Sequence, residues 1–457
     1  FVFEKRILDR LVRFWKTYPI MKTVVAKFGG TSMGSAEAIA SVADIIQKNS
    51  CPTVAVVSAT SGTTDSLIVL GREAMTKGAW EGVLHLLQDR HEKIIKDLGI
   101  ACDLSPFWSD VEKIVHGVAM LGELSLSTLD RLQSFGERMS ATILVSLLRR
   151  RGMEAVVLDA YDIVFTDNNF GAGNVHCEKT YARAEEIILA HIEKGVIPVV
   201  TGFIGQSESG QYITLGRGGS DYSGALIAAA IGAEELQIWT DVDGILNTDP
   251  RLVPSAKVLE QLSFYEAGEL AYFGAKVLHP KTIKPAVEKN IPVRILNTFN
   301  PSARGTVITN EERQSIKAVT YKKGVTIVNI SSLGMLNAHG FLARIFDVFA
   351  QEKVIVDVIA TSEVSVSLTV DHELPKNVVQ KLGAFASVEV HEQKAIVCLV
   401  GGGIRTQKDL LRKLFTAVEE FEIHMISQGA SKRNITFAVN QDDATTIIKK
   451  IFDAFFL

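Results

Sequence analysis

Short continuous apolar runs alternate with longer stretches of helical spacing over the N-terminal part of the chain. Residues 23–28 (TVVAKF) predict a buried strand that ends at Gly29-Gly30, and residues 35–49 place apolar side chains on one face of a helix. Residues 53–59 (TVAVVSA) predict a second buried strand. A strand, a glycine turn, a helix and a strand form a βαβ unit, whose two strands run parallel.

The same alternation continues toward residue 299. Further apolar runs predict strands at 155–160, 196–205, 235–245 and 293–299, whereas residues 67–135 are mostly helical in composition. Strands that are apolar throughout are covered on both faces of their sheet. The pattern therefore predicts an α/β fold, a three-layer αβα sandwich around a mainly parallel sheet.

A polar, turn-rich segment at 300–315 marks a domain boundary, and shorter elements follow it. They read β-α-β-β twice, beginning at 325–331 (VTIVNIS) and at 395–401 (AIVCLVG). The repeated order predicts two tandem ferredoxin-like βαββαβ units. We expect four segments in all, at 1–20, 21–305, 306–392 and 393–457.

Composition narrows the class of protein without naming a function. The chain has 457 residues, with 48 basic and 52 acidic side chains, and the net charge of −4 does not suggest nucleic acid as a partner. Its four cysteines form no CxxC pair, so neither a zinc site nor a disulfide framework is expected. Reduced thiols in a cytoplasm are the expected state. No apolar run approaches the roughly 18 residues of a membrane span.

Residues 1–20 are basic and roughly amphipathic, and Met21 follows them. They lack the apolar region and the small-residue cleavage site of a signal peptide. We expect an upstream extension or a surface helix here, with a membrane-surface or targeting helix as the alternative.

Two glycine-rich segments carry the densest candidate chemistry, Lys27–Ser32 (KFGGTS) and Leu215–Asp221 (LGRGGSD). Glycines let backbone N–H groups approach a phosphate closely, and a following helix N-terminus favours negative charge. Lys27 adds a charge that can follow a migrating phosphoryl group, and Arg217 suits bidentate capture of a carboxylate. The alternative for Lys27–Ser32 is an ordinary strand-to-helix turn. No Walker pattern GxxxxGK[ST] occurs in the chain.

Four further segments place polar groups near predicted strand ends or on a helix. Ser58–Asp65 (SATSGTTD) offers hydroxyls and amides to an anion, or simply caps a helix. Glu137 in SFGERMS suits an ammonium group, or is a solvated helix carboxylate. Residues 239–251 (WTDVDGI and NTDPR) suit a nucleotide, and FGAKVLHP places a second lysine, Lys276, after a glycine.

The candidate chemistry includes no covalent nucleophile. Phosphoryl transfer mainly requires positioning and neutralisation of charge, and an acceptor carboxylate is already ionised at neutral pH. A protein base is therefore unnecessary, which agrees with the absence of a Ser/His/Asp or Cys/His constellation in these motifs.

Six motifs occur in order over residues 27–280: KFGGTS, SFGERMS, GRGGSD, WTDVDGI, NTDPR and FGAKVLHP. Together they resemble the aspartokinase branch of the amino-acid kinase family, and the tail resembles the paired ACT domains of that branch. The resemblance implies an ATP-dependent kinase that converts aspartate to 4-phospho-L-aspartate. This is the first step toward lysine (through diaminopimelate), threonine and methionine. Because the chain ends at Leu457, soon after the second unit, a fused homoserine dehydrogenase is not expected.

The resemblance also implies roles for individual residues. Lys27 and Lys276 neutralise the transferring phosphoryl group, and Asp221 organises them. Glu137 holds the ammonium group of aspartate and Arg217 its α-carboxylate. The rest of the aspartate pocket is Ser58, Thr64, Phe203 and Ser220.

The implied ATP site contains the glycine segments and the strand-end residues. Magnesium bridges the phosphates and takes no ligand from the protein. Leu246 stands where relatives often place an aromatic ring against the adenine. The implied ATP contacts are Lys27, Phe28, Gly29, Gly30, Gly218, Gly219, Thr240, Asp241, Leu246, Arg251, Lys276 and Val277.

The first small unit resembles the ACT domain of the lysine-sensitive type, in which lysine binds between ACT units of two chains. The resemblance implies feedback inhibition by lysine and at least a homodimer. Asp357 and Glu363 attract the ammonium groups of lysine, and Ala338 replaces a hydroxyl found in some relatives. The implied effector residues are Met335, Ala338, Gly340, Phe341, Leu342, Asp357, Ser362 and Glu363.

Two other functions remain open at this point. One is a kinase of the same fold that acts on glutamate, acetylglutamate or a nucleotide. The other is a catalytically silent amino-acid sensor that uses only its ACT units. The first is disfavoured by SFGERMS and the tandem tail, and the second by Lys27, Arg217, Asp221 and Lys276 together.

Overall fold

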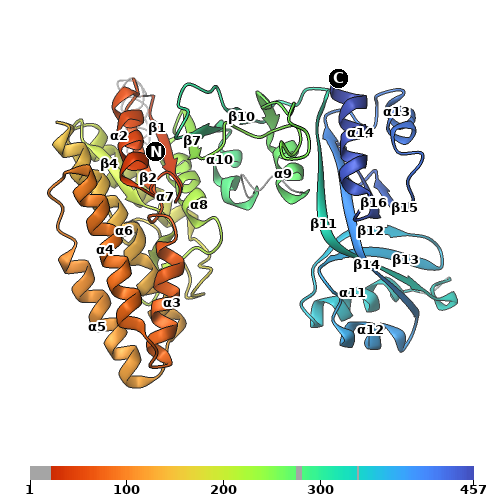
Figure 1. Cartoon of the computed structure of the whole chain (residues 1–457), viewed down its shortest axis with the longest axis horizontal. Helices are drawn as coiled ribbons and strands as arrows, with labels where there is room; N and C mark the ends of the chain where they lie inside the picture. Colours follow the sequence, from red (N-terminus) through yellow and green to blue (C-terminus); the bar gives the residue numbers. More distant parts are fainter. Residues whose placement is uncertain (1–21, 274–279, 337–338) are drawn as a thin grey trace, which may run out of the picture. The chain divides into compact units, whose positions relative to one another are not determined.

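A computed structural model describes residues 22–273, 280–336 and 339–457 (Figure 1). The chain divides into two compact units. The first comprises Phe1–Gly244 and Pro280–Thr309, and the second comprises Ile245–His279 and Asn310–Leu457. The expected main domain at 21–305 differs from this division, because residues 245–279 group with the C-terminal part of the chain. The extension expected at 1–20 lies outside the described residues.

The sheet of the first unit is mainly parallel, as predicted. Its first-unit strands have the order β3-β4-β2-β1-β7-β9-β10, and β10 alone among them pairs antiparallel, with β9. The apolar runs predicted as strands all form strands, whereas β10 lies in the segment predicted to be a turn-rich boundary. The strands are β1 (Val24–Phe28), β2 (Thr53–Val57), β3 (Ala155–Leu158), β4 (Ile197–Thr201), β7 (Glu235–Thr240), β9 (Val293–Asn297) and β10 (Thr306–Thr309).

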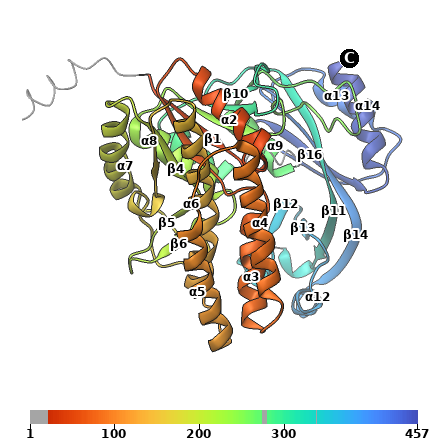
Figure 2. The same ribbon diagram turned by 60° about the vertical axis from the view of Figure 1, so that its left-hand side comes forward.

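Helices cover both faces of this sheet, which gives the predicted three layers (Figure 2). Alternate residues of β1 point to opposite faces, so that Ala26 and Phe28 join the core beneath α2–α6. Lys27 packs on the other face, where α8 crosses it. One helical layer contains α2 (Ala36–Lys48), α3 (Thr63–Met75), α4 (Trp80–Leu98), α5 (Ser105–Leu121) and α6 (Leu126–Arg150), and the other contains α7 (Cys177–Ile192), α8 (Gly219–Ile231) and α10 (Lys284–Glu288). Smaller elements are the hairpin β5 (Ile204–Gln206) and β6 (Tyr212–Thr214), and the 3-10 turns η1 (Ala160–Asp162) and η2 (Pro280–Ile283).

The second unit contains a six-stranded antiparallel sheet of order β12-β13-β11-β14-β16-β15. Its two central strands are long and run through both halves of the unit (Figure 1). The strands are β8 (Gln261–Ser263), β11 (Ile316–Ser331), β12 (Val356–Thr361), β13 (Ser365–Asp371), β14 (Ser387–Gly401), β15 (Ile423–Gln428) and β16 (Asn434–Asn440). The helices are α9 (Phe264–Phe273), α11 (Phe341–Gln351), α12 (Lys376–Gly383), α13 (Leu410–Ala417) and α14 (Ala444–Phe456), with the 3-10 turn η3 (Leu333–Met335).

The two small βαββαβ halves share these long strands, with a separate apolar core in each half. Val328 and Ile330 of β11 pack with α11 and α12, whereas Val319 of the same strand packs with α13 and α14. Residues 316–323 thus supply the last strand of the second half, although they precede the first half in sequence. The expected tandem split at 392/393 therefore differs from how the cores divide.

No helix among the described residues is both long and apolar enough to cross a membrane.

Candidate active site

A cavity of about 760 Å³ opens in the first unit where strands β1, β2 and β7 end. The carboxyl ends of parallel strands are the usual ligand site of such sheets. The cavity brings together most residues predicted for the two substrates. These are Lys27, Gly29, Gly30, Ser58, Thr64, Glu137, Phe203, Arg217, Gly218, Gly219, Ser220, Asp221, Thr240 and Asp241.

Three of the predicted ATP contacts that the structure describes do not line this cavity. Phe28 is fully buried, and its ring stacks on Trp239 with 6.1 Å between centroids, so the side chain belongs to the core. Leu246 and Arg251 belong to the second unit, where Arg251 pairs with Asp249 at 2.7 Å. Lys276 and Val277 lie outside the described residues.

Lys27 and Asp221 form a largely buried ion pair at the cavity. The Nζ atom of Lys27 lies 2.6 Å from Oδ1 of Asp221, with side-chain exposures of 11% and 16%. Lys27 is near the C-terminal end of β1, and Asp221 is in the first turn of α8. Gly224 allows the approach of helix to strand, because a Cβ there would lie only 3.3 Å from Cβ of Lys27. The carboxylate thereby fixes the position of a buried ammonium group.

Two helices begin at the cavity wall. Helix α3 follows Gly62 and helix α8 follows Gly218, and both glycines have the left-handed backbone that other residues rarely adopt. Neither helix start is capped by a side chain. The first backbone N–H groups of a helix have no partner within it and carry partial positive charge. Both helix starts are therefore suited to anionic groups.

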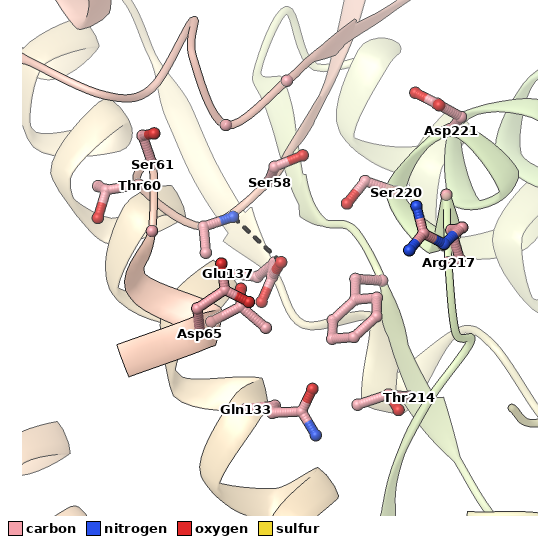
Figure 3. Close-up of a pocket in the computed structure, with 18 of the residues that line it drawn as sticks. Ser58, Thr60, Ser61, Asp65, Gln133, Glu137, Thr214, Arg217, Ser220 and Asp221 are labelled. Carbon is pink, nitrogen blue, oxygen red and sulfur yellow. Dashed lines mark hydrogen bonds between the residues drawn. The ribbon is translucent and has the colours of Figure 1, made fainter. Parts of the chain in front are cut away.

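Glu137 is a buried carboxylate with one free oxygen. Its side chain comes from the middle of α6 and is 3% exposed. The backbone N–H of Ala59 donates to Oε1 at 3.1 Å (Figure 3), and Oε2 has no hydrogen-bond partner among the residues that the structure describes. Burial raises the pKa of this carboxyl to about 8, although the N–H of Ala59 and the charge of Lys27 oppose the rise. An unpaired buried carboxylate oxygen at a cavity is suited to a cationic ligand.

Arg217 lies across the cavity from Glu137 (Figure 3). Its side chain is exposed and makes no ion pair with the residues the structure describes. Phe203 is also at the cavity, with a left-handed backbone at φ 71°. Its N–H donates to Oγ of Ser223 at 3.0 Å, which holds this strained position against α8. A cationic wall and an acidic wall therefore face one cavity.

Several lining residues were not predicted, among them Gln133 and Thr214. Gln133 stands one helical turn before Glu137, and that spacing could have identified it. Thr214 is fixed by the buried Asp130, whose carboxylate accepts the N–H and the hydroxyl of Thr214, each at 2.9 Å, and the N–H of Gly171 at 2.8 Å. No local sequence signal marks this contact, because Asp130 and Thr214 are distant in the chain.

The predicted effector residues lie in the second unit. Gly340, Phe341 and Leu342 lie at the start of α11, Met335 ends the 3-10 turn η3, and Ser362 and Glu363 follow β12. Ala338 lies outside the described residues. Asp357 on β12 is 1% exposed and is already paired, because it accepts a hydrogen bond from the hydroxyl of Tyr272 and lies 3.1 Å from Nζ of Lys322.

The other half of the second unit repeats this cluster with different residues. Val356 pairs with Val370 in the first half as Ile423 pairs with Val439 in the second, so His424 corresponds to Asp357 and Asn440 to Asp371. The Nζ atom of Lys394 lies 3.0 Å from Nε2 of His424 and 2.7 Å from Oδ1 of Asn440.

Comparison with known proteins identifies the family. The amino acid kinase family matches residues 22–297, and the ACT domain matches residues 328–384 and 397–455. Aspartokinase 3, chloroplastic, from Arabidopsis thaliana is 39% identical over 95% of this chain and 82% of its own length.

Two solved structures of E. coli aspartokinase III are similar over 95% of this chain and 100% of their own, each with 34% identity. The complex with aspartate and ADP has a TM-score of 0.81, and the complex with lysine and aspartate has 0.80. Sequence and fold agree over almost the whole chain, so the chain belongs to the aspartokinases, within the amino acid kinase family.

Proposed function

We propose that this chain transfers the γ-phosphoryl group of ATP to the side-chain carboxylate of L-aspartate, giving 4-phospho-L-aspartate and ADP. The observation that carries the proposal is one cavity that holds the Lys27–Asp221 pair, two open helix N-termini and the free oxygen of Glu137. Positive groups for phosphate and carboxylate anions and a negative group for an ammonium ion therefore line one cavity.

Aspartate is bound through its three charged groups. Glu137 takes the ammonium group on its free Oε2, and Arg217 takes the α-carboxylate from the opposite wall. Ser58, Thr64, Phe203 and Ser220 complete the pocket around the side chain. A ligand without an ammonium group leaves the buried Glu137 carboxylate unpaired, and a buried unpaired group is a strong source of discrimination.

The reaction needs no protein base. An oxygen of the aspartate side-chain carboxylate attacks the γ-phosphorus, the bond from that phosphorus to the bridging oxygen breaks, and ADP leaves with the electron pair. Lys27 stabilises the charge on the transferring group, while Asp221 holds the ammonium in place. Thr240 and Asp241 contact the nucleotide. Leu246, Arg251, Lys276 and Val277 remain predicted ATP contacts, and Lys276 also remains a predicted partner of the transferring phosphoryl group.

Magnesium is expected to travel with the nucleotide. Among the described residues no group of three His, Cys, Asp or Glu side chains can hold a metal ion. Asp221 already pairs with Lys27, so the phosphate oxygens are the natural ligands for Mg²⁺ in this cavity. When bound, the ion neutralises phosphate charge.

Lysine is the proposed feedback inhibitor, and the ACT halves are the proposed contact in a homodimer or larger homo-oligomer. The support is the similarity to the lysine complex of the E. coli enzyme. A cytoplasmic location stays a prediction from the separated, unpaired cysteines.

Trapping the acyl phosphate as a hydroxamate tests the function directly. With ATP, Mg²⁺ and aspartate, the wild-type chain should form aspartyl hydroxamate, and added lysine should reduce the yield. Lys27→Ala and Asp221→Asn should each lower kcat by about 10²- to 10³-fold, because each leaves a charge unbalanced where phosphate charge develops. The control is Lys22→Ala, whose ammonium pairs with Glu234 outside the cavity.

Formation of hydroxamate from glutamate or acetylglutamate, with none from aspartate, would replace this proposal by another kinase of the same fold. Binding of lysine without any binding of ATP would replace it by a sensor.

A further inference from the structure

Helix α4 contacts the loop between β2 and α3 on the side away from the cavity, and no residue of α4 lines the cavity. Atom Nη2 of Arg90 lies 3.0 Å from Oγ1 of Thr60, 2.5 Å from the carbonyl oxygen of Ser61 and 2.6 Å from Oγ1 of Thr63. One guanidinium group thus fastens both side chains and backbone of a loop only five residues long (58–62).

His91, the next residue on α4, completes the attachment. Its Nδ1 lies 2.8 Å from the carbonyl oxygen of Leu87, which only accepts, so Nδ1 carries the proton. Burial lowers the pKa of this histidine to about 4, so the ring is neutral at physiological pH and Nε2 is an acceptor. Thr60 therefore donates its hydroxyl proton to Nε2 over 3.2 Å and keeps its lone pairs for Arg90 and Thr63. Nη2 of Arg90 has two N–H groups for three acceptors, so two of these oxygens share one hydrogen.

The front of the same loop faces the substrates. Ser58 and Ser61 line the cavity, and the N–H of Ala59 holds Oε1 of Glu137. The contact with α6 is close, because a Cβ at Gly136 would come within 2.7 Å of Cβ of Ala59. A movement of Thr60 would therefore shift both the loop and the carboxylate that receives the ammonium group.

Arg90 also brings a positive charge to this loop. It lies at the start of α3, where the helix dipole already disfavours a cation. It makes no ion pair within the described residues, and its buried Nε has no hydrogen-bond partner.

We propose that Arg90 is a positioning residue for the acceptor amino acid, acting through Thr60 and the 58–62 loop. This inference rests on the proposed function. Loss of Arg90 should weaken the binding of aspartate and not that of ATP. Arg90 acts on the loop that carries Ser58 and, through that loop, on Glu137, whereas the Lys27–Asp221 pair lies on other elements.

The test is a split between the two Michaelis constants. Arg90→Ala should raise KM for aspartate about tenfold and leave KM for ATP within about twofold. Free guanidinium ion added at low concentration should restore part of the aspartate affinity of Arg90→Ala. The KM for aspartate of Arg90→Lys should lie between those of the wild type and Arg90→Ala. Lys93→Ala is the matched control three residues later on α4, because its ammonium pairs with Asp97 on the same helix. It should leave both constants unchanged.

Thr60→Val removes the hydroxyl without changing the shape, and it keeps the test decisive should Arg90→Ala fold poorly. It should show the same split between the two constants. Equal changes in both constants, or an unchanged KM for aspartate in folded variants, would overturn the inference.

Calorimetric titration of aspartate into the wild type and Arg90→Ala measures the same effect without turnover. Weaker binding by the variant supports the inference, whereas equal binding contradicts it. A failure of the hydroxamate assay in the wild type would instead contradict the proposed function, so the two failures are distinguishable.

Discussion

Two buried carboxylates in this chain are assigned to receive an ammonium group, and their surroundings differ. Glu137, in the first unit, has one oxygen held by a backbone N–H and the other without a partner. Asp357, in the second unit, has one oxygen bonded to Tyr272 and the other paired with Lys322. Burial raises the pKa of both, and at Asp357 the Tyr272 hydroxyl and Lys322 oppose the rise.

In their proposed roles, Glu137 and Asp357 must therefore respond differently to a ligand ammonium group. Glu137 is ready to accept a cation and only has to lose a proton. Asp357 already has a cation from its own chain, so a ligand ammonium must replace Lys322 or share the carboxylate with it. A catalytic site gains from such preorganisation, whereas a regulatory site must discriminate between states and gains from an exchange.

The other half of the second unit narrows the comparison. At the position of Asp357 it has His424, and at that of Asp371 it has Asn440. Lys394 lies between them as Lys322 lies between the two aspartates. Neither of these two positions carries a carboxylate, although Glu422 lies 3.8 Å from Nδ1 of His424 and Asp443 accepts a hydrogen bond from Asn440 at 3.3 Å. We therefore expect only the first half of the second unit to bind lysine as an effector.

The largest expected effect is at Glu137. Glu137→Gln keeps the shape and removes the charge, so the ammonium group of aspartate loses its ionic partner in a buried site. The expected fall in kcat/KM for aspartate is on the order of 10²- to 10³-fold, from about 2–5 kcal/mol for such a pair. Asp357→Asn is the counterpart, and it should leave uninhibited activity within about twofold while it abolishes inhibition by lysine. An unchanged KM for aspartate in Glu137→Gln would contradict the assignment of Glu137 to the ammonium group of aspartate.

The second effect is a pH dependence carried by Glu137. With its pKa raised to about 8, the ligand-free carboxyl is mostly protonated below that pH and must ionise to bind an ammonium ion. KM for aspartate should therefore fall on the order of tenfold as pH rises through about 8, and Glu137→Gln should abolish this change.

Stability should respond to pH in the opposite sense. Glu137 has an ordinary pKa of 4.5 in the unfolded chain and a pKa of about 8 in the folded, ligand-free protein. Between pH 4.5 and about 8 the folded protein therefore holds a proton that the unfolded chain has lost. The stabilising contribution is therefore complete below 4.5 and is lost as pH rises toward 8. The Tm of ligand-free wild type should fall more across this window than that of Glu137→Gln, and the same Tm profile in both proteins would contradict the assignment.

The parallel sheet and the glycine loops were predictable because their signals are local. A strand buried on both faces is a continuous apolar run, and the carboxyl ends of such strands meet at one edge. Lys27, Ser58 and Asp241 could therefore be assigned to one site from the sequence alone. Asp130 and Arg90 could not, since their roles depend on contacts with loops 84 and about 30 residues distant in sequence.

The shared strands of the second unit were missed for a physical reason. The polar residues Lys322, Lys323 and Gly324 interrupt an apolar pattern, and such an interruption usually marks the end of a strand. Here β11 continues through them with register shifts, because it passes from one core to the other at this point. The apolar pattern of the sequence shows that the side chains pass from one core to the other. It does not show that the strand itself continues without a break.

The smallest expected effect tests whether Lys322 competes with the effector. Lys322→Met removes the resident ammonium group and leaves Asp357 free, so the lysine concentration for half inhibition should fall about five- to tenfold, a difference typical of one charged hydrogen bond. Burial lowers the pKa of Lys322, but Asp371 and Asp357 together raise it above the ordinary value, so the wild-type competitor stays charged across the assay range. Lys394→Met makes the corresponding change in the other half and should leave inhibition unaltered. Should Lys322→Met weaken inhibition, Lys322 would support the effector site rather than compete for it, and Asp357 would resemble Glu137 after all, as a carboxylate whose neighbours prepare it for a ligand.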